Sequence, residues 1–338
     1  MRHWLLIALL TWVTFADRPP LRFRRDGTFK IAQFSDLHFG EAEETDWGPK
    51  QDEDSLRYIL DKEKPDLVVL TGDVITGEEG NNIVDNATTY WRMALSPMIK
   101  RKIEWASAFG NHCPIASGIN GTRTDLMRED VSHASSRSQF GPSDIEGVSN
   151  YALPIHDHTG ATFMLYLMDS NYLPCLNSSA PCFYPNQVEW LERQMKLSAG
   201  EDGSVMPSFA FFHIPIIEYD LMWNCNTSYG YQNDTEVASQ GVNTGMFRVF
   251  QENGGTAIFV GHNHGNDYCG TRLGVKLCYG RHTGHGGYGD EWKKGARIIK
   301  IHNRGSLGRF STWLRMEDGE KITKEPVHVP DGACESSE

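Results

Sequence analysis

TAIFVGHNH, residues 256–264, joins an apolar run to a glycine and to two histidines one residue apart. An apolar run without polar alternation is typical of a strand that is covered on both faces. The pair His262 and His264, taken alone, is also explained by a solvent-exposed turn, because short motifs often occur without a function. The choice between a turn and a pair of ligands therefore depends on the rest of the chain.

Four other apolar runs end in the same kind of residue. They are IAQFSDLH with Asp36 and His38, LVVLTGD with Asp73, WASAFGNH with Asn111 and His112, and SFAFFH with His213. In α/β sheets, ligands bind outside the carboxyl ends of the strands. The preference of Asp, Asn and His for turns does not explain why five apolar runs of one chain are all followed by these residues. We therefore expect these side chains to meet in one site.

Between the apolar runs lie helical patterns. We expect helices over residues 52–64, 90–100 and 185–195, and strands over residues 31–34, 67–70, 105–109, 162–168, 209–212 and 256–260. Such alternation predicts a layered α/β domain. Hairpins and single strands from Tyr268 to Met316 indicate mixed sheets. No repeat or long linker divides the chain, which indicates one domain over residues 17–316 and a polar C-terminal tail over residues 317–338.

The composition restricts the class of partner. The chain has 338 residues and a formal net charge of −12. This charge argues against duplex nucleic acid as a partner, because phosphate backbones are bound by clustered Lys and Arg. A small phosphate ester remains a possible ligand if metal ions supply the positive charge.

The N-terminus resembles a secretory signal. Arg2 and His3 precede an apolar stretch, and Thr14-Phe15-Ala16 forms a small-x-small cleavage site. The stretch is shorter than the roughly 20 residues of a membrane span. We therefore expect a signal peptide over residues 1–16, with an uncleaved anchor as the alternative, and no other membrane span. The mature protein is then extracellular, or vacuolar or lysosomal through the secretory pathway.

Sequons and cysteines agree with this route. The sequons are Asn86, Asn120, Asn177, Asn226 and Asn233, and together they predict a glycosylated surface. Two local disulfides are expected, Cys175–Cys182 and Cys269–Cys278, because an oxidising compartment preserves them. Cys113, Cys225 and Cys334 cannot be paired from the sequence. A lone cysteine such as Cys113 is more often a disulfide partner or a small buried side chain than a nucleophile.

The residue types at the strand ends indicate the chemistry. Carboxylates, imidazoles and an amide oxygen suit divalent Zn, Mn or Fe. The absence of a thiolate cluster from the sequence excludes a structural zinc site with four cysteines. Seven candidate ligands and one extra histidine exceed the needs of one four-coordinate ion. Two divalent ions about 3.5–4 Å apart, sharing a carboxylate, would use the seven ligands.

The order DLH, GD, GNH, strand-terminal H and GHNH resembles that of the calcineurin-like metallophosphoesterases, from Thr28 to Tyr288. Residues 242–270, with CYG at 278–280, are similar to a purple-acid-phosphatase-related branch of plants and fungi. The resemblance implies a four-layer α/β/β/α sandwich of two mixed β-sheets flanked by helices.

The resemblance also implies roles for the candidate residues. It places Asp36, His38 and His264 on a first metal, Asn111, His213 and His262 on a second, and Asp73 between the two. His112 would lie beside the metals and reach the oxygens of the substrate without ligating either ion.

The chain departs from purple acid phosphatases at several positions. Their colour comes from a tyrosine three residues after the bridging Asp, where this chain has Thr76, and His38 stands where their first motif has Gly. We therefore expect a colourless enzyme with Zn, Mn or Fe(II). Cys113 occupies a position that is commonly Asp or Glu in the superfamily. The Asp that orients His112 in some protein phosphatases is also missing.

The expected function is that of a secreted phosphatase that hydrolyses monoesters, either small phosphate esters or phosphoproteins. Two metal ions would lower the pKa of a bridging water from about 15.7 towards about 7, and the hydroxide would attack phosphorus in line. His112 would stabilise the transition state or protonate the leaving group. Arg281, His282 and His285 either contact the substrate or belong to a solvated glycine-rich loop.

Two alternatives remain open from the sequence. One is a phosphodiesterase or nucleotide-pyrophosphate hydrolase with the same pair of metals. The other is a degenerate homologue that keeps the fold to bind a partner. Because all seven presumed ligands are present, the second alternative is the weaker. The oligomeric state is not indicated by the sequence.

Overall fold

The computed structural model describes residues 18–41, 47–77, 83, 86–113, 120–200, 203–222, 228–234, 236–289, 291–303 and 308–323. The expected signal peptide, Asn226, Cys225 and Cys334 lie outside these residues.

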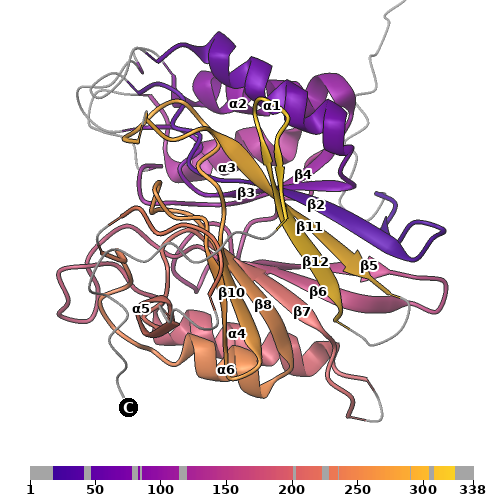
Figure 1. Cartoon of the computed structure of the whole chain (residues 1–338). Coiled ribbons are helices and arrows are strands. Elements are labelled where there is room, and N and C mark those ends of the chain that lie inside the picture. Colours follow the sequence, from indigo (N-terminus) through magenta and orange to yellow (C-terminus); the bar gives the residue numbers. More distant parts are fainter. Residues whose placement is uncertain are drawn as a thin grey trace, which may run out of the picture.

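Two mixed β-sheets stacked face to face form the centre of the molecule (Figure 1). The six-stranded sheet has the order β13 (Lys321–Ile322), β12 (Phe310–Met316), β11 (Gly295–His302), β2 (Thr28–Phe34), β3 (Leu67–Thr71) and β4 (Glu104–Ala108). The seven-stranded sheet has the order β1 (Leu21–Arg22), β5 (Tyr151–His156), β6 (Ala161–Leu167), β7 (Ser208–Phe211), β8 (Gly255–Val260), β10 (Val275–Tyr279) and β9 (Cys269–Arg272). Neighbours are parallel from β2 to β4 and from β6 through β8 to β10.

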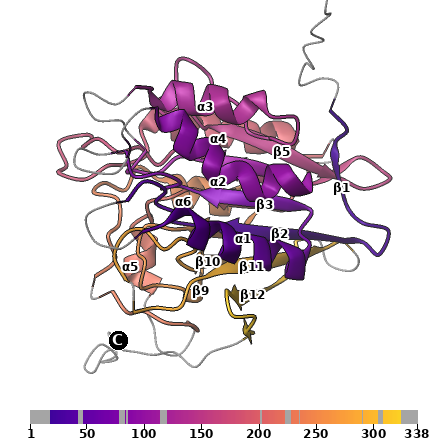
Figure 2. The same cartoon turned by 90° about the horizontal axis from the view of Figure 1, so that it is seen from above.

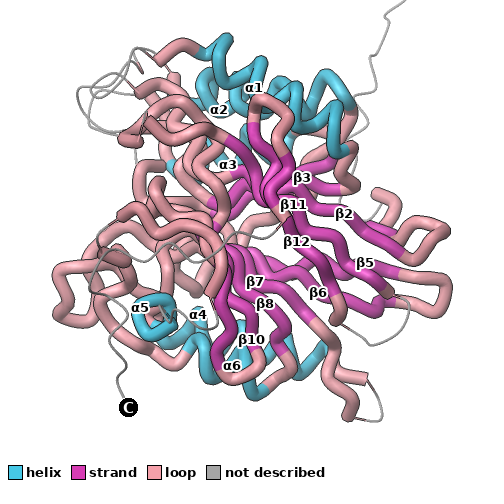
Figure 3. The backbone as a smooth tube through the Cα atoms, in the orientation of Figure 1, coloured by secondary structure: helices cyan, strands magenta, loops and turns pink. Residues whose placement is uncertain are grey.

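Helices cover the outer face of each sheet (Figure 3). On the six-stranded sheet lie α1 (Pro49–Glu63), α2 (Ala87–Arg101) and α3 (Arg123–Ser132), side by side in Figure 2. On the seven-stranded sheet lie α4 (Pro185–Ser198), α6 (Met246–Glu252) and the short α5 (Glu218–Met222). The order helix, sheet, sheet, helix confirms the predicted α/β/β/α sandwich.

Alternation along the strands explains why the apolar runs are nearly continuous. In β3, Leu67 and Val69 belong to the core between the sheets, whereas Val68 and Leu70 pack under the helices. The same alternation occurs in β2, β7 and β8. Because successive side chains of a strand point to opposite faces, a strand buried on both faces needs apolar residues at every position.

Element ends differ in detail from the expected ones. Helix α1 begins at Pro49 rather than Asp52, since proline is favoured in the first turn, where its missing N–H costs no hydrogen bond. The polar segment expected from Glu317 onward starts inside the six-stranded sheet, because β13 pairs with β12 through Leu314 and Ile322. A tail would therefore begin after this hairpin.

Both expected local disulfides, Cys175–Cys182 and Cys269–Cys278, are present. The sequon asparagines among the described residues, Asn86, Asn120, Asn177 and Asn233, are all exposed. Within the described ranges, no helix has the length and apolar character needed to cross a membrane.

Candidate metal centre

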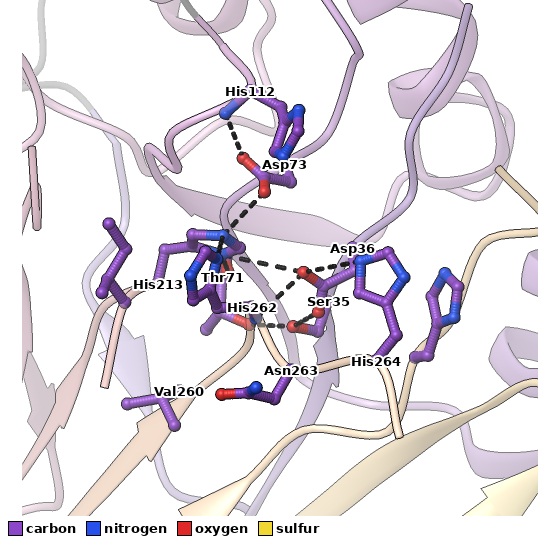
Figure 4. A network of polar contacts seen from close by, with 12 residues as sticks. Ser35, Asp36, Thr71, Asp73, His112, His213, Val260, His262, Asn263 and His264 are labelled. Carbon is purple, nitrogen blue, oxygen red and sulfur yellow. Dashed lines mark hydrogen bonds and ion pairs between the residues drawn. The ribbon is translucent and has the colours of Figure 1, made fainter. Parts of the chain in front are cut away.

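The polar residues that follow the strands meet where the two sheets come together. The six-stranded sheet supplies Asp36 and His38 after β2, Asp73 after β3, and Asn111 and His112 after β4; the seven-stranded sheet supplies His213 after β7 and His262 and His264 after β8. Figure 4 shows Asp36, Asp73, His213, His262 and His264 around one centre, with His112 on the Asp73 side. The site therefore lies at the carboxyl ends of parallel strands, as expected.

Two glycines allow the sheet ends to approach this closely. A Cβ atom on Gly72, which has φ +86°, would lie 2.4 Å from Nδ1 of His213. A Cβ atom on Gly261 would lie 2.1 Å from Oγ of Ser35. Any larger residue would push the strand ends apart, so the glycines before Asp73 and His262 are required by packing.

The first group consists of Asp36, His38 and His264, whose ligand atoms all lie within 4.8 Å of one another. Nε2 of His38 is 3.1 Å from Nε2 of His264. Nδ1 of His264 donates to the carbonyl oxygen of Tyr288 at 2.8 Å, which leaves the lone pair on Nε2 facing the group. Nδ1 of His38 lies 2.8 Å from Oγ1 of Thr76, the residue that replaces the tyrosine of purple acid phosphatases.

The second group consists of Asp73, His213 and His262, again with ligand atoms within 4.8 Å. Nε2 of His213 is 2.7 Å from Oδ2 of Asp73 and 3.2 Å from Nδ1 of His262. Nδ1 of His213 donates to the carbonyl oxygen of Thr71 at 2.8 Å. A backbone carbonyl therefore sets the tautomer of this histidine and points Nε2 into the group.

Asn111 gives independent evidence for a cation. Its side-chain oxygen Oδ1 is buried and has no hydrogen-bond partner among the described residues. A buried acceptor without a partner costs about 1–3 kcal/mol. Asn111 directly precedes His112, whose backbone N–H donates to Asp73 of the second group. A metal ion is therefore a fitting partner for this oxygen.

The backbone at the site is strained. Four of the candidate ligands, none of them glycine, have φ in the left-handed region: Asp36 at 57°, His38 at 52°, Asp73 at 45° and His262 at 77°. Such conformations are uncommon for residues with a Cβ atom, and they concentrate at functional sites. The surrounding sheets therefore force the chain to turn sharply where the ligands begin.

Burial keeps most of the imidazoles neutral. It lowers the pKa of His38 well below 6.5, with the neighbouring His264 and His112 adding to the effect. Burial and His213 lower the pKa of His262 to about 3, and burial also lowers the pKa of His264. Neutral rings keep a lone pair, which is the form that binds metals.

Asp73 and His213 influence each other in the opposite sense. Burial alone would raise the pKa of Asp73, but His213 and His112 outweigh it and the pKa falls well below 3.8. Burial alone would lower the pKa of His213, and the contact with Asp73 raises it instead. Asp73 is therefore an anion, able to neutralise part of the charge of bound cations.

His112 lies beside both groups and belongs to neither. Its backbone N–H donates to Oδ1 of Asp73 at 2.8 Å, and its ring centroid is 5.1 Å from that of His38. The residue is part-buried. The role beside the metals that the family resemblance implies for it stays a prediction.

A buried ion pair supports the turn that carries Asn111 and His112. Nη1 of Arg123 donates to the carbonyl oxygen of Gly110 at 2.8 Å, and Nη2 lies 2.7 Å from each carboxylate oxygen of Asp169. The side chain of Arg123 is 10% exposed and that of Asp169 is fully buried. Sequence analysis did not identify this pair, because its members are far apart in the chain.

Replacing Asp169 with alanine is expected to lower the free energy of unfolding by about 3–5 kcal/mol, since the guanidinium of Arg123 would remain buried without a counter-charge. Urea denaturation measures this effect. The control is Glu252→Gln, which breaks an exposed pair with Arg248 on α6 and is expected to cost under about 1 kcal/mol. Equal effects of the two changes would contradict the supporting role.

The structure gives Arg281, His282 and His285 partners inside the protein. Arg281 pairs with Asp267 at 2.7 Å and donates to the carbonyl oxygen of Lys293. His282 is 1% exposed, and its Nε2 donates to the carbonyl oxygen of Gly286. His285 contacts the carboxylates of Asp52 and Glu317. These side chains therefore do not belong to a solvated loop, and their contact with substrate stays a prediction.

Tyr288 is a site residue that sequence analysis missed. Its ring stacks on that of His264 with centroids 4.1 Å apart and an interplanar angle of 8°. Its hydroxyl accepts from the backbone N–H of His264 at 2.9 Å and donates to Asp234 at 3.0 Å. The only signal in the sequence was its place in the glycine-rich stretch RHTGHGGYG.

Cys113 is buried and, among the cysteines of the described residues, is not in a disulfide. Burial and the nearby Asp73 raise the pKa of its thiol to about 12. The thiol therefore remains protonated at neutral pH and has no nucleophilic role.

Two packed mixed sheets whose parallel strands end in two groups of carboxylate and imidazole ligands define a metallophosphoesterase-type protein. The sequence profile described as calcineurin-like phosphoesterase matches residues 29–266. The chain belongs to this family.

Curated relatives support the purple-acid-phosphatase-related branch. The chain is 30% identical to "Probable inactive purple acid phosphatase 14" of Arabidopsis thaliana, over 89% of this chain and 84% of that protein. It is 29% identical to "Phosphatase DCR2" of Saccharomyces cerevisiae, over 93% of this chain and 59% of that protein. The predicted relation to proteins of plants and fungi is confirmed.

Solved structures show the same fold at low identity. A dimetal phosphatase from Danio rerio aligns with a TM-score of 0.57 and 14% identity, over 87% of this chain and 98% of that one. A purple acid phosphatase from yellow lupin aligns with a TM-score of 0.51 and 13% identity, over 90% of this chain and 54% of that one.

Proposed function

We propose that the protein is a phosphatase that hydrolyses phosphate monoesters with two divalent ions, which are Zn, Mn or Fe(II). Asp36, His38 and His264 would hold one ion. Asn111, His213 and His262 would hold the other, and Asp73 would be shared by the two. The observation that carries the proposal is the close pair of ligand groups, each with its atoms within 4.8 Å.

Bound divalent ions supply positive charge for the phosphoryl oxygens and acidify water. The protein's own part is to hold the ligands rigidly and to present His112. Its backbone N–H donates to Asp73, and its ring lies beside that of His38, with centroids 5.1 Å apart. From there the imidazole can donate a proton to an oxygen of the substrate or of the leaving group.

We further propose that the protein acts outside the cytosol, in the extracellular space or in a vacuole or lysosome. The disulfides Cys175–Cys182 and Cys269–Cys278 and the exposed sequon asparagines support this localisation.

A catalytically inactive binding protein is the second candidate, because the plant relatives are named probable inactive purple acid phosphatases. The yeast relative, in contrast, is named a phosphatase. Against the inactive protein stands the geometry of the two ligand groups, each with its ligand atoms within 4.8 Å of one another.

Elemental analysis and a substrate panel across pH test the proposal together. We expect about two divalent ions per chain and faster turnover of an aryl monophosphate than of an aryl phosphodiester, with both activities lost on chelation. Iron-loaded protein is expected to be colourless, because Thr76 replaces the tyrosine that would give the purple colour. Faster diester turnover would favour a phosphodiesterase, and bound metal without any turnover would favour the inactive candidate.

A further inference from the structure

Residues 284–289, GHGGYG, form a loop that packs against the first ligand group, and we call it the glycine loop. A Cβ atom on Gly286 would lie 2.5 Å from the carbonyl oxygen of His38. A Cβ atom on Gly287 would lie 2.5 Å from Cε1 of His264. The loop is therefore in direct contact with two candidate ligands, and only glycine fits at these positions.

The glycine loop orients His264. The carbonyl oxygen of Tyr288 accepts from Nδ1 of His264, the ring of Tyr288 stacks on the imidazole, and the Tyr288 hydroxyl accepts from the backbone N–H of His264. On its other side the imidazole packs on His282, with ring centroids 4.0 Å apart. The direction of the His264 lone pair thus depends on where the loop places Tyr288.

The loop is held by hydrogen bonds to neighbouring segments rather than by secondary structure of its own. It contains no helix or strand, and its four glycines offer no side chains for packing. On the inner side, His282 donates to the carbonyl oxygen of Gly286 at 3.0 Å and Lys294 donates to that of Gly289 at 2.8 Å. The backbone N–H of Gly284 also donates to the carbonyl oxygen of Asp36 at 3.2 Å, and that of Trp292 donates to the carbonyl oxygen of Gly289 at 3.2 Å. The side-chain anchors of the loop are Tyr288, which donates to Asp234, and His285, which contacts two carboxylates.

His285 lies between two carboxylates. Nδ1 is 2.9 Å from Oδ1 of Asp52, and Nε2 is 2.9 Å from Oε2 of Glu317. Its backbone N–H also donates to Oδ1 of Asp52 at 2.7 Å. A carboxylate accepts but does not donate, so both contacts are hydrogen bonds only when both ring nitrogens carry protons. The geometry therefore requires an imidazolium.

The two carboxylates are themselves held by other elements. Asp52 is fully buried in α1 and accepts from Nε1 of Trp47 at 2.6 Å. Glu317, directly after β12, accepts from Oγ of Ser55 at 2.9 Å and from the backbone N–H of Lys294 at 3.1 Å. The group Asp52–His285–Glu317, which we call the charge clamp, thus ties the loop to α1 and to the six-stranded sheet.

We propose that His285 is a positioning residue of the metal centre: the charge clamp fixes the glycine loop, and through Tyr288 the loop fixes His264 as a metal ligand. The inference rests on the proposed function, because it assumes that the first ligand group binds a metal ion. It goes beyond that function because none of the three clamp residues touches the ligand groups.

The clamp depends on pH. Burial alone would lower the pKa of His285, but the hydrogen bonds to Asp52 and Glu317 outweigh it and raise the pKa to about 9. The other charged residues that line the same surface depression are Asp54, Glu291, Lys293 and Lys294. Because the pKa in the folded protein lies above the usual 6.5, the stabilisation that the clamp contributes is fully present below about pH 6.5 and is lost as the pH rises through about 9. At pH 7 the imidazolium form still predominates.

The test is the metal affinity of full-length His285→Gln, measured by competition with a chelator on Zn- or Mn-loaded protein. At pH 7 we expect one of the two ions to bind about 10–100-fold more weakly than in the wild type. The matched control is His133→Gln, which removes a histidine–glutamate contact with Glu129 on α3, away from the loop. The control is expected to keep both affinities.

The pH series separates positioning by charge from simple loss of packing. The affinity ratio of wild type to His285→Gln is expected to fall towards one as the pH rises from 7 through about 9, because the wild type then loses its own clamp. A ratio of one at pH 7, or a ratio that does not change with pH, would overturn the proposal.

A second variant covers the case in which His285→Gln does not fold. Glu317→Gln keeps an oxygen acceptor and leaves the contacts with Asp52 in place, and a smaller loss of affinity with the same pH trend is expected. If Glu317→Gln bound both metal ions as tightly as the wild type, the proposed role of the charge clamp would be wrong. A wild type that binds two ions but hydrolyses no phosphate ester would overturn the proposed function, while the affinity ratio would still decide the clamp.

Discussion

Replacing Asp73 with asparagine is expected to lower kcat/KM for an aryl monophosphate by about 10³-fold or more. The carboxylate belongs to the second ligand group and, in the proposed mechanism, would serve both ions. The charge stabilisation supplied by a metal pair amounts to several kcal/mol, with about 1.4 kcal/mol for each tenfold change in rate. Asparagine has nearly the same shape and keeps an oxygen to accept the backbone N–H of His112, so the fold is expected to survive.

Steady-state kinetics and elemental analysis on the same preparation measure this effect, and metal content should fall with activity. Asp54→Asn serves as the control, because it removes a carboxylate of the same kind from an exposed pair with Lys50 and Arg57 on α1. If Asp73→Asn kept more than about a tenth of the activity, less than about 1.4 kcal/mol of transition-state stabilisation would depend on the charge, and the dinuclear mechanism would be wrong.

Replacing His112 with asparagine is expected to lower kcat by about 10²–10⁴-fold, the usual contribution of a general acid or base. Both ions should remain bound, because His112 belongs to neither ligand group and its contact with Asp73 is made by the backbone. The effect should appear in kcat more than in KM, as expected for an interaction that strengthens in the transition state.

Kinetic constants and metal content together distinguish this role from ligation. The control is His158→Gln, which removes an exposed histidine elsewhere in the protein. Loss of metal from His112→Asn would make the residue a ligand, and an unchanged kcat would remove it from the proposed chemistry.

Much of the centre could be predicted because its parts are local. Asp36, Asp73 and His262 each stand within three residues of the end of an apolar run, and each run forms a strand of one of the two sheets. The periodicity of a strand and the end of its apolar run are visible within about ten residues. The parallel neighbours β2, β3 and β4 then bring their polar ends to the same edge without further information.

The surroundings of the ligands could not be predicted in the same way. His285 was considered as a substrate contact, but its partners Asp52 and Glu317 come from α1 and from the turn after β12. Arg123 and Asp169 likewise belong to different layers of the molecule. Nothing within a short window of sequence indicates such pairs, because they form only when helices and loops pack on the completed sheets.

The sequence alone determined which residue types would stand at the strand ends, and therefore the class of ligand and the family. The tertiary structure decided which nitrogen of His264 and of His213 faces the centre, since these choices depend on the carbonyl oxygens of Tyr288 and Thr71. The physical reason is how far apart in the sequence the interacting residues are. Hydrophobic periodicity acts along one segment, whereas the orientation of a buried imidazole is set by hydrogen-bond partners that distant segments supply.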